Sequence, residues 1–528
     1  AISGASNSTY TVQAGDVGDT IEASVTATNA GGSATATTAP TAVVTSATQP
    51  GSSQFPLRVS ANGRYLENAA GNPWLLVGDS PQSMIGNLSQ TNADAYLDDR
   101  KSEGFDAVWD NLLCDDYTAC ASNGKAVGDG SGSACNNCAP FTVGTGPSSY
   151  DVGGESSPPY CGDCNSAYFS RAHDIIAHAA ADNIEVLLNP AETGGWLTFT
   201  ENNGDGTLST TDGDYRYGEY LGNEFKDLPN IIWLMGNDFQ NVSTQPDENN
   251  LKTVLNGIKA TDPGALYTVE TDYTSDFSTS TSITDANGFD TTWDNYTLLD
   301  AVYTYSPAYD GISEANAEAP TMPSFLAESN YEGQKNGSYD GCQTIRNCRL
   351  QEWWTMTSGA AGQLYGGNYQ LSTGTPDMGS FGIQNGFTDA DIDTPGAQQL
   401  GYETDLLKSI AWQNLKPDTG HDVVTSGVGS CPASPSSIVN VTCVTTASDY
   451  SGPGTATESV SYLPDPSSFS TITVDLAAFA GEITAQWFDP TNGSYTSAGT
   501  FSPSGTHTFT PTSNNSAGDK DWVLLLQS

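Results

Sequence analysis

Eight short apolar runs that end in polar residues are the feature of this sequence that most constrains its fold. They lie between Phe55 and about Pro417, and helical stretches such as 91–104, 167–183 and 349–359 separate them. Because strands that are apolar almost throughout are typical of buried parallel sheets, eight strand–helix units predict a (β/α)8 barrel of the TIM type. A doubly wound sheet is the alternative, but no Gly-rich phosphate loop follows any run. The runs are WLLVGDS (74–80), FDAVWDN (105–111), IEVLLNP (184–190), NIIWLMGND (230–238), ALYTVETD (265–272), LDAVYTYS (299–306), PSFLAES (323–329) and GQLYGGN (362–368).

Strand patterns flank the predicted barrel on both sides. Residues 1–46 alternate apolar and polar positions between Gly and Asn turns, and residues 47–54 have the composition of a linker. Residues 417–528 return to strand patterns with a hairpin turn at DPTNGSY, which predicts a C-terminal β-sandwich. We therefore expect a multidomain protein with a β-domain at 1–46, a catalytic barrel at 55–416 and a β-sandwich at 417–528.

The N-terminal β-domain is expected to be incomplete. Its stretch NSTYTVQAGDVGDTI, followed by ASVTATNAGGSATAT, resembles the second half of bacterial immunoglobulin-like repeats, whose earlier strands are missing here. Either the segment is a processed fragment or another chain supplies the missing strands, which would allow self-assembly.

The charge and cysteine content indicate an exported protein. With 62 acidic and 16 basic residues the formal net charge is −46, so nucleic acids and anionic membrane surfaces are repelled. No run approaches the ~20 apolar residues that a membrane-spanning helix needs. The ten cysteines are an even number and fall in close pairs, which is typical of disulfides in an oxidising compartment. We expect a secreted or cell-surface protein.

The cysteine spacing suggests local bridges. Cys342–Cys348 and Cys431–Cys443 are predicted pairs, and all ten cysteines are expected to be oxidised. A segment at 114–164, inserted between the second and third strands and expected to form a lid or wall of the cleft, carries the other six. Its CNNC and CGDC motifs have zinc-like spacing, but disulfides are the preferred interpretation. These six are Cys114, Cys120, Cys135, Cys138, Cys161 and Cys164.

One acidic stretch, ENNGDGTLSTTD at 201–212, follows part of a calcium-loop template. Its first and last acids are the wrong types for that template, so a solvated turn is the main interpretation and a structural calcium ion the alternative. No other cofactor is expected. The proposed ligands are Glu201, Asn203, Asp205, Ser209 and Asp212.

Catalytic groups of such a barrel are expected at the carboxyl ends of its strands. Acids and amides dominate these ends, and no Ser/His/Asp or Cys/His set can be assembled from the four histidines, which leaves hydrolysis by paired carboxylates, the chemistry of glycosidases. Asp238 and Glu328 stand out, because their separation in sequence places them on strands four and seven. The remaining candidates are Asp79, Asp110, Asn189, Glu270 with Asp272, Tyr305 and Asn368.

Several blocks of sequence, in order, resemble the apiosidase-like glycoside hydrolases. The resemblance covers about 55–416, and the segment from WFDPTNGSY to DWVLLL resembles the sandwich, named for collagen binding, that follows those barrels. The blocks are FPLRVSANGRYLENAAGNPWLLVGDS, YLDDRKSEGFDAVWDN, YGEYLGNEFKDLPNIIWLMGND, PSFLAESNYEG and WWTMTSGAAGQLYGGN.

The resemblance implies a retaining mechanism with Asp238 as acid/base and Glu328 as nucleophile. It also implies that Asp79 binds a sugar hydroxyl and that Asn237 bonds the sugar 2-hydroxyl, while Asp110, Asn189 and Tyr305 are expected to line the substrate site. This chain departs from the family where Asn237 replaces a usual Gly and where VETDYTSD replaces a usual His-Pro after strand five.

Two functions follow from these observations. The leading one is a secreted glycoside hydrolase that acts on a polysaccharide or oligosaccharide. The alternative is a non-catalytic surface, filament or adhesin protein whose barrel only binds glycan. The acids at 238 and 328 favour the enzyme, whereas the incomplete N-terminal β-domain favours assembly.

Overall fold

The computed structural model describes residues 22–29, 31–38, 54–130, 133–154, 157–239, 242, 244–271, 283–284, 290–291, 293, 296–317, 320–333, 341–367, 380–432, 438–464 and 467–528. It divides into two compact units, Ala1–Gln54 and Phe55–Ser528. The second unit contains both the barrel and the C-terminal β-sandwich, so these two pack together as one body.

In the first unit, β1 (Ser24–Asn29) and β2 (Gly32–Thr37) form an antiparallel hairpin. Hydroxyl pairs such as Thr26–Thr35, at 2.7 Å, join the strands, and every side chain of the two strands is exposed. A two-stranded hairpin is marginal in water by itself. The hairpin confirms the strand pattern at 24–37, whereas the pattern at 1–21 and 39–46 lies outside the described residues. Completion of the domain by another chain stays a prediction.

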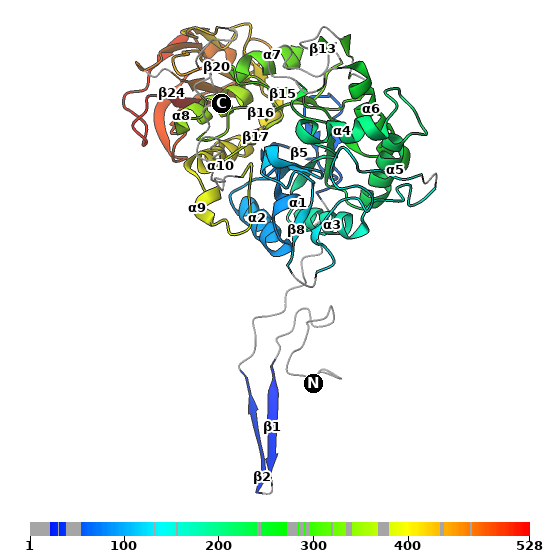
Figure 1. Cartoon of the computed structure of the whole chain (residues 1–528). Coiled ribbons are helices and arrows are strands. Elements are labelled where there is room, and N and C mark those ends of the chain that lie inside the picture. The colour runs from blue at the N-terminus through cyan, green and yellow to red at the C-terminus, as the bar shows by residue number, and fades with distance from the viewer. Residues whose placement is uncertain are drawn as a thin grey trace. The chain divides into compact units, whose positions relative to one another are not determined.

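The second unit contains the predicted barrel of eight parallel strands (Figure 1). Its edge strands are joined by hydrogen bonds from Leu298 N to Tyr267 O (2.9 Å) and from Thr268 Oγ1 to Leu299 O (2.7 Å), which nearly close the sheet. In spatial order the strands are β12 (Leu266–Thr268), β11 (Ile231–Leu234), β10 (Glu185–Asn189), β7 (Ala107–Asn111), β6 (Leu76–Asp79), β17 (Gly362–Tyr365), β16 (Ser324–Glu328) and β15 (Asp300–Tyr303).

Alternate residues of these strands fill the barrel, because successive side chains of a strand point to opposite faces. Trp109, Leu187 and Leu234 belong to the cluster inside the barrel. A small sheet of β3 (Arg58–Val59), β4 (Leu66–Glu67) and β5 (Pro73–Trp74) adds Leu66 and Trp74 to that cluster. The interior is therefore a packed core rather than a pore.

Helices follow the strands, and their first residues are suited to capping. Thr244 and Asp247 form a capping box at the start of α6, and Ser89 accepts a hydrogen bond from Asn92 N at the start of α2. No described helix is long and apolar enough to cross a membrane. The helices are α1 (Met84–Asn87), α2 (Gln90–Ser102), α3 (Ser166–Ala181), α4 (Thr193–Asn203), α5 (Gly213–Phe225), α6 (Gln245–Thr261), α7 (Ala308–Ala317), α8 (Ile345–Thr357), α9 (Asp389–Ile392) and α10 (Pro395–Lys408).

The C-terminal β-sandwich has a six-stranded and a three-stranded antiparallel sheet. Its own core includes Val474, Ile483 and Leu524. The larger sheet has the order β18 (Lys416–Pro417), β20 (Thr445–Ser448), β21 (Glu458–Leu463), β26 (Trp522–Gln527), β23 (Ile483–Phe488), β24 (Tyr495–Phe501), and the smaller one has the order β19 (Val424–Ser426), β22 (Ile472–Asp475), β25 (Thr506–Phe509).

Helix α8 joins the barrel to this sandwich. Trp353 stacks on Tyr462 of β21 with ring centroids 6.0 Å apart, and Trp354 Nε1 donates to the Cys443 carbonyl at 3.0 Å. Both tryptophans are fully buried. The run of apolar and aromatic residues in α8, read in the sequence only as a helix, therefore forms the contact between two domains.

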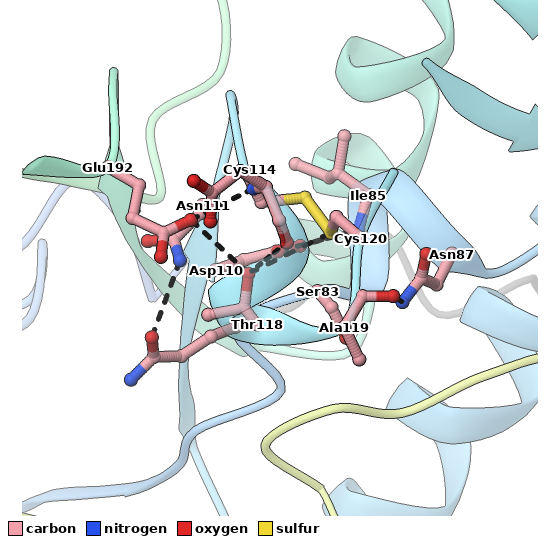
Figure 2. Close-up of a disulfide and its surroundings, with 12 residues drawn as sticks. Ser83, Ile85, Asn87, Asp110, Asn111, Cys114, Thr118, Ala119, Cys120 and Glu192 are labelled. Carbon is pink, nitrogen blue, oxygen red and sulfur yellow. Dashed lines mark hydrogen bonds between the residues drawn. A yellow bond between two sulfur atoms is a disulfide. The ribbon is translucent and has the colours of Figure 1, made fainter. Parts of the chain in front are cut away.

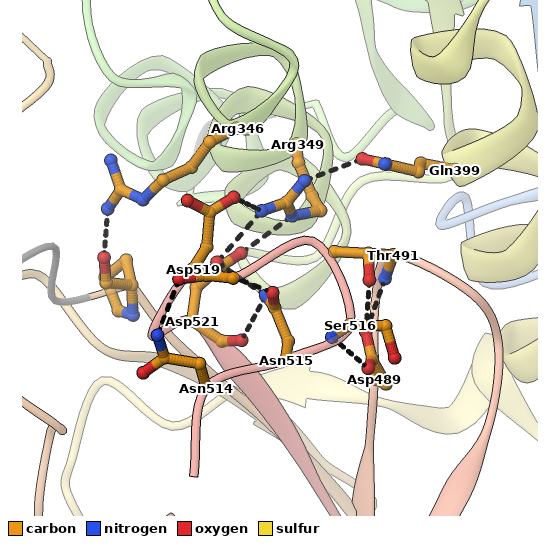
Figure 3. A network of polar contacts seen from close by, with 12 residues as sticks. Arg346, Arg349, Gln399, Asp489, Thr491, Asn514, Asn515, Ser516, Asp519 and Asp521 are labelled. Carbon is orange, nitrogen blue, oxygen red and sulfur yellow. Dashed lines mark hydrogen bonds and ion pairs between the residues drawn. The ribbon is translucent and has the colours of Figure 1, made fainter.

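A buried ion pair lies at the same contact (Figure 3). Arg349 of α8 donates from Nε and Nη2 to the two Asp521 oxygens at 2.7 and 2.9 Å, and also to Asp519 and Gln399 at 2.9 and 2.6 Å. Burial acts to raise the pKa of Asp521, but the Arg349 guanidinium outweighs it and holds that pKa below its usual value.

Eight of the ten cysteines form disulfides, and zinc at CNNC and CGDC is thereby ruled out. The predicted Cys431–Cys443 bridge is present. The insertion at 114–164 is crosslinked three times, by Cys114–Cys120, Cys135–Cys138 and Cys161–Cys164.

The predicted Cys342–Cys348 bridge is wrong in this structure, because both residues are buried free thiols. Cys342 Sγ donates to the Asn330 carbonyl at 3.0 Å, and burial raises the pKa of both thiols. Their spacing in sequence suggested a local bridge; the two thiols do lie near each other, joined by a hydrogen bond instead of a disulfide.

The first disulfide lies at the start of the insertion and packs against α1 (Figure 2). Cys114–Cys120 packs on Gly86 so closely that a Cβ there would lie 2.6 Å from Cys114 Sγ. Asn87 Nδ2 donates to Ala119 O at 3.1 Å, and Thr118 Oγ1 donates to Glu192 at 3.2 Å. These contacts come from α1 and from the segment before α4.

The insertion also has more core than its Gly- and Ser-rich composition suggests. Phe141 and Tyr150 are buried, and Tyr150 stacks on Trp196 of α4 with centroids 5.7 Å apart. Phe141 contacts Phe199 and Tyr217 of α4 and α5. Crosslinks therefore supplement packing here instead of replacing it, and the lid role stays a prediction.

We predict that Arg349→Ala destabilises the protein by about 3–5 kcal/mol, because it leaves Asp521 buried without its cation. Urea unfolding at neutral pH measures this, with Arg58→Ala as the control: Arg58 forms an exposed pair with Glu67, so the cost there is ~0–1 kcal/mol. A carboxyl with a lowered pKa contributes stability that is lost as pH falls through that pKa. The effect of Arg349→Ala should therefore shrink in strong acid, and equal effects of the two variants would contradict the assignment.

Candidate active site

Polar side chains gather at the carboxyl ends of the barrel strands on the inner face. Trp109, Leu187 and Ala301 lie inside the barrel, and every second residue of a strand faces the same side. The polar residues that end or follow those strands in the same phase therefore also face inward. Of the remaining candidates, Asp272 and Asn368 lie outside the described residues. The inner polar group contains Asn111, Asn189, Asn237, Asp238, Glu270, Tyr303, Tyr305 and Glu328, and all are buried.

Glu328 reaches the inner face through a β-bulge. Regular alternation would turn it outward with Leu326, which packs in the outer layer. In the pairing of β15 with β16, however, Val302 pairs with Leu326 and the next residue, Tyr303, pairs with Glu328. The extra residue, Ala327, re-aims Glu328 to the same face as Tyr303, as bulges near active sites do.

Asp238 lies in a tight turn after β11. Its φ is +49°, in the left-handed region that few non-glycine residues occupy, and Gly236 has a φ of +75°. A Cβ at Gly236 would lie 2.6 Å from the Phe239 ring. The backbone N–H of Asp238 donates to Glu270 Oε1 at 3.3 Å, which anchors the turn to the segment that follows β12.

Phenol hydroxyls connect the two acids. Tyr303 OH contacts Asp238 Oδ1 at 2.9 Å and Tyr305 OH at 2.8 Å, and Tyr305 OH contacts Glu328 Oε1 at 3.2 Å. Tyr331 OH donates to the other Glu328 oxygen at 2.9 Å. The structure thus brings Asp238, Glu328 and Tyr305 into one site, as predicted for their strands.

The surroundings of the Glu328 and Glu270 carboxyls favour their protonated forms. Burial raises the pKa of Glu328 to about 8, the charge of Asp238 adds to this effect, and the hydroxyls of Tyr331, Tyr303 and Tyr305 oppose it. Burial, followed by the charges of Glu328 and Asp238, raises the pKa of Glu270 well above its usual value. Each of these carboxyls therefore opposes the ionisation of the others.

Asp79 and Asp110 were expected to bind substrate, but their contacts give both a structural role. Asp79 lies on the same outward face of its strand as Val77. It accepts a hydrogen bond from Tyr96 OH at 2.6 Å, and one of its oxygens lies 3.5 Å from Arg100 Nη1. Asp110 accepts Ile85 N at 3.1 Å on the outer side of β7. Both acids therefore hold helices to the sheet.

The two predicted asparagines support each other. Asn189 Nδ2 donates to Asn237 Oδ1 at 3.0 Å, and the same oxygen accepts Thr193 N at 3.1 Å. Asn237 Nδ2 makes no hydrogen bond within the described part of the chain, so it is a donor that a ligand can use.

One connection to Glu328 was missed in the sequence. Asn111 Nδ2 donates to Gln82 Oε1 at 3.3 Å, Gln82 Nε2 donates to Tyr331 OH at 2.9 Å, and Tyr331 contacts Glu328. The alternation of β7 could have identified Asn111, since it shares a face with Trp109, whereas nothing in the sequence marks Gln82.

The predicted calcium ligands do not converge in the loop they were taken from. Glu201 and Asn203 belong to α4, Asp205 accepts Thr207 N at 2.9 Å, and Asp212 caps α5. A calcium ion at 201–212 stays a prediction that these contacts do not support. Among the described residues, acids or histidines close enough to share an ion occur at Asp98, His178 and Asp182.

A family model described as "Apiosidase-like, catalytic domain" matches residues 60–414, which contain the whole site above. The chain belongs to the apiosidase-like family. A second model, described as "Putative collagen-binding domain of a collagenase", matches residues 459–527 of the sandwich. Both matches confirm the resemblances that the sequence blocks indicated.

Solved structures share the apiosidase-like barrel and its sandwich at low sequence identity. A glycoside hydrolase is 18% identical with a TM-score of 0.65, covering 90% of this chain and 97% of its own. A glycoside hydrolase family 5 protein from Bacteroides vulgatus is 18% identical with a TM-score of 0.64, covering 89% and 93%. These likenesses show a glycoside hydrolase fold. No curated protein sequence matches the chain.

We predict that Tyr331→Phe raises the pKa of Glu328 further, because it removes a donor to the ionised form. A hydrogen bond to a charged group is worth ~1.5–3 kcal/mol, so the rise is about 1–2 pH units. Carbon-13 NMR of labelled glutamate, with Glu328→Gln to assign the signal, measures it. Tyr309→Phe is the control, because Tyr309 OH donates to the distant Pro432 carbonyl. An unchanged pKa would mean that Tyr331 does not stabilise the carboxylate.

Proposed function

We propose that this apiosidase-like protein is an extracellular glycoside hydrolase that cleaves a polysaccharide or oligosaccharide with retention of configuration. Glu328 is the nucleophile and Asp238 the general acid/base. The family match and the barrel support glycoside hydrolysis, and the contacts between the two acids support the retaining mechanism.

The observation that carries this mechanism is the chain of hydroxyls between the two acids. Tyr303 OH donates to Asp238 Oδ1 and contacts Tyr305 OH, and Tyr305 OH donates to Glu328 Oε1. A retaining enzyme begins its reaction with an ionised nucleophile and a protonated acid/base. The hydroxyls of Tyr305 and Tyr331 donate to Glu328 and stabilise its ionised form, which supports Glu328 as the nucleophile.

The short path between the acids also favours retention. Tyr303 OH bonds Asp238 and also lowers the pKa of Glu328 through a hydrogen bond, so one hydroxyl is shared by both carboxyls. Retaining enzymes separate their carboxyls by ~5–5.5 Å and inverting enzymes by ~6.5–9.5 Å. A shared phenol fits the shorter separation.

In the first step Glu328 attacks the anomeric carbon while Asp238 gives its proton to the leaving oxygen. A glycosyl ester forms on Glu328, and Asp238, now ionised, takes a proton from the water that hydrolyses the ester. Tyr305 and Tyr331 hold the Glu328 carboxylate during attack. Asn237 Nδ2 is placed to donate to a sugar hydroxyl, and the expectation that this is the 2-hydroxyl stays part of the proposal.

The support for an extracellular location is the oxidation state of the cysteines. Four disulfides need an oxidising compartment to persist. The apiosidase-like family match supports a carbohydrate ligand, and the net charge of −46 disfavours nucleic-acid binding.

We predict that Glu328→Ala abolishes turnover on every substrate, whereas Asp238→Ala spares the first step for aryl glycosides whose leaving group needs no proton. Azide should rescue Glu328→Ala with inverted product and Asp238→Ala with retained product. Polarimetry or proton NMR of the released sugar identifies the anomer.

The control for these variants is Asp227→Ala, which removes an exposed acid that pairs with His173 outside the barrel mouth. It should keep full activity. Full activity in both alanine variants at 238 and 328 would reject the mechanism and leave the glycan-binding scaffold as the function.

A further inference from the structure

Glu270 is a third carboxyl at the barrel mouth, and the mechanism above does not use it. We infer that Glu270 is held as a neutral carboxylic acid, which positions the turn of Asp238 and leaves the negative charge of the site to Glu328. The inference deepens the proposed function and rests on the roles given there to Asp238 and Glu328.

The two oxygens of Glu270 have different surroundings. Oε1 accepts the backbone N–H of Asp238 at 3.3 Å, while Oε2 is buried and has no hydrogen-bond partner among the described residues. A carboxylate spreads its charge over both oxygens and loses free energy wherever one of them is buried without a donor. In the neutral acid, Oε1 is the carbonyl acceptor and Oε2 carries the proton. Oε2 is then an unpaired hydroxyl, which costs less free energy in a buried site than an unpaired charged oxygen.

The groups that face Glu270 also disfavour its ionisation. Asp238, Glu328 and Tyr303 act on it from the ends of β11, β16 and β15, and each is an acid. Among the ion pairs of the described residues, none involves Glu270 or Glu328. An additional buried charge here would be opposed by repulsion and by lost hydration together.

Hydrogen-bond donors decide which of the two glutamates stays ionised. Glu328 receives the hydroxyls of Tyr305 and Tyr331, one on each oxygen. Glu270 receives one backbone N–H on one oxygen. Donors stabilise the charged form of a carboxyl, so Glu328 ionises before Glu270 as pH rises, and Glu270 keeps its proton.

The contact to Asp238 gives Glu270 its positioning role. Asp238 has a left-handed backbone, which costs free energy unless the surroundings fix it, and the Glu270 carbonyl is one of the groups that fix it. Glutamine keeps this acceptor and is neutral at every pH. It is therefore the substitution that a neutral acid should tolerate.

Kinetics of three variants test the inference. Glu270→Gln should keep kcat/KM within about threefold of the wild type with an unchanged pH profile, whereas Glu270→Ala should lose about tenfold or more in kcat. Glu328→Gln, the same substitution at the ionised residue, should be inactive. A pH profile displaced in Glu270→Gln, or a loss equal to that of Glu270→Ala, would overturn the inference.

A second measurement needs no activity and so separates this inference from the proposed function. An acid whose pKa is raised by folding stabilises the fold fully below its unfolded pKa of ~4.3, and this contribution is lost as pH rises through the folded pKa. Glutamine has no such loss. The Tm of Glu270→Gln minus that of the wild type should therefore increase between about pH 5 and pH 8.

Glu67→Gln, on the surface beside Arg58, is the matched control and should show no such increase. A difference for Glu270→Gln that does not change with pH would mean that Glu270 is ionised in the fold. This result would overturn the inference even if the protein hydrolysed glycans as proposed, and the expected result would support it even if no glycan were hydrolysed.

Discussion

Buried carboxyls share the barrel mouth only because protons and phenol hydroxyls limit their charge. Asp238, Glu270 and Glu328 come from three different strands, and Tyr303 and Tyr305 from a fourth lie between them. Each phenol can donate one proton and accept another, so the pair forms a hydrogen-bonded path between Asp238 and Glu328. A regular strand would turn Glu328 and Asp238 away from the barrel mouth. The bulge in β16 and the turn at Gly236 direct them into it.

The eight strands could be predicted from the sequence because buried parallel strands are apolar along their whole length. That same uniformity hides which face of the strand each residue occupies. Asp79 and Asp110 were assigned to the substrate site by their position at strand ends, whereas their phase, shared with Val77 and Val108, turns them toward the helices. The phase of β7 should have selected Asn111 instead.

Glu328 presents the opposite case. Its phase with Leu326 would have excluded it, but its position at a strand end, its separation from Asp238 and the family resemblance selected it. A bulge depends on how two strands pair across the sheet, which periodicity within one strand does not contain. The sequence could therefore predict that acids such as Asp238 and Glu328 lie at strand ends of a barrel. The contacts of the tyrosines that connect them could be found only in the structure.

The buried acids also change the meaning of the net charge. The formal value of −46 counts every carboxyl as ionised. Burial raises the pKa of Glu185, Glu192 and Asp214 well above the usual value, and that of Glu352 to about 8, in addition to the acids of the barrel mouth. These carboxyls therefore keep their protons to a higher pH in the folded protein than in the unfolded chain, so the formal value overstates the negative charge of the fold wherever the pH lies below their raised pKa values. Their combined contribution to stability is largest in acid and declines as pH rises through those pKa values.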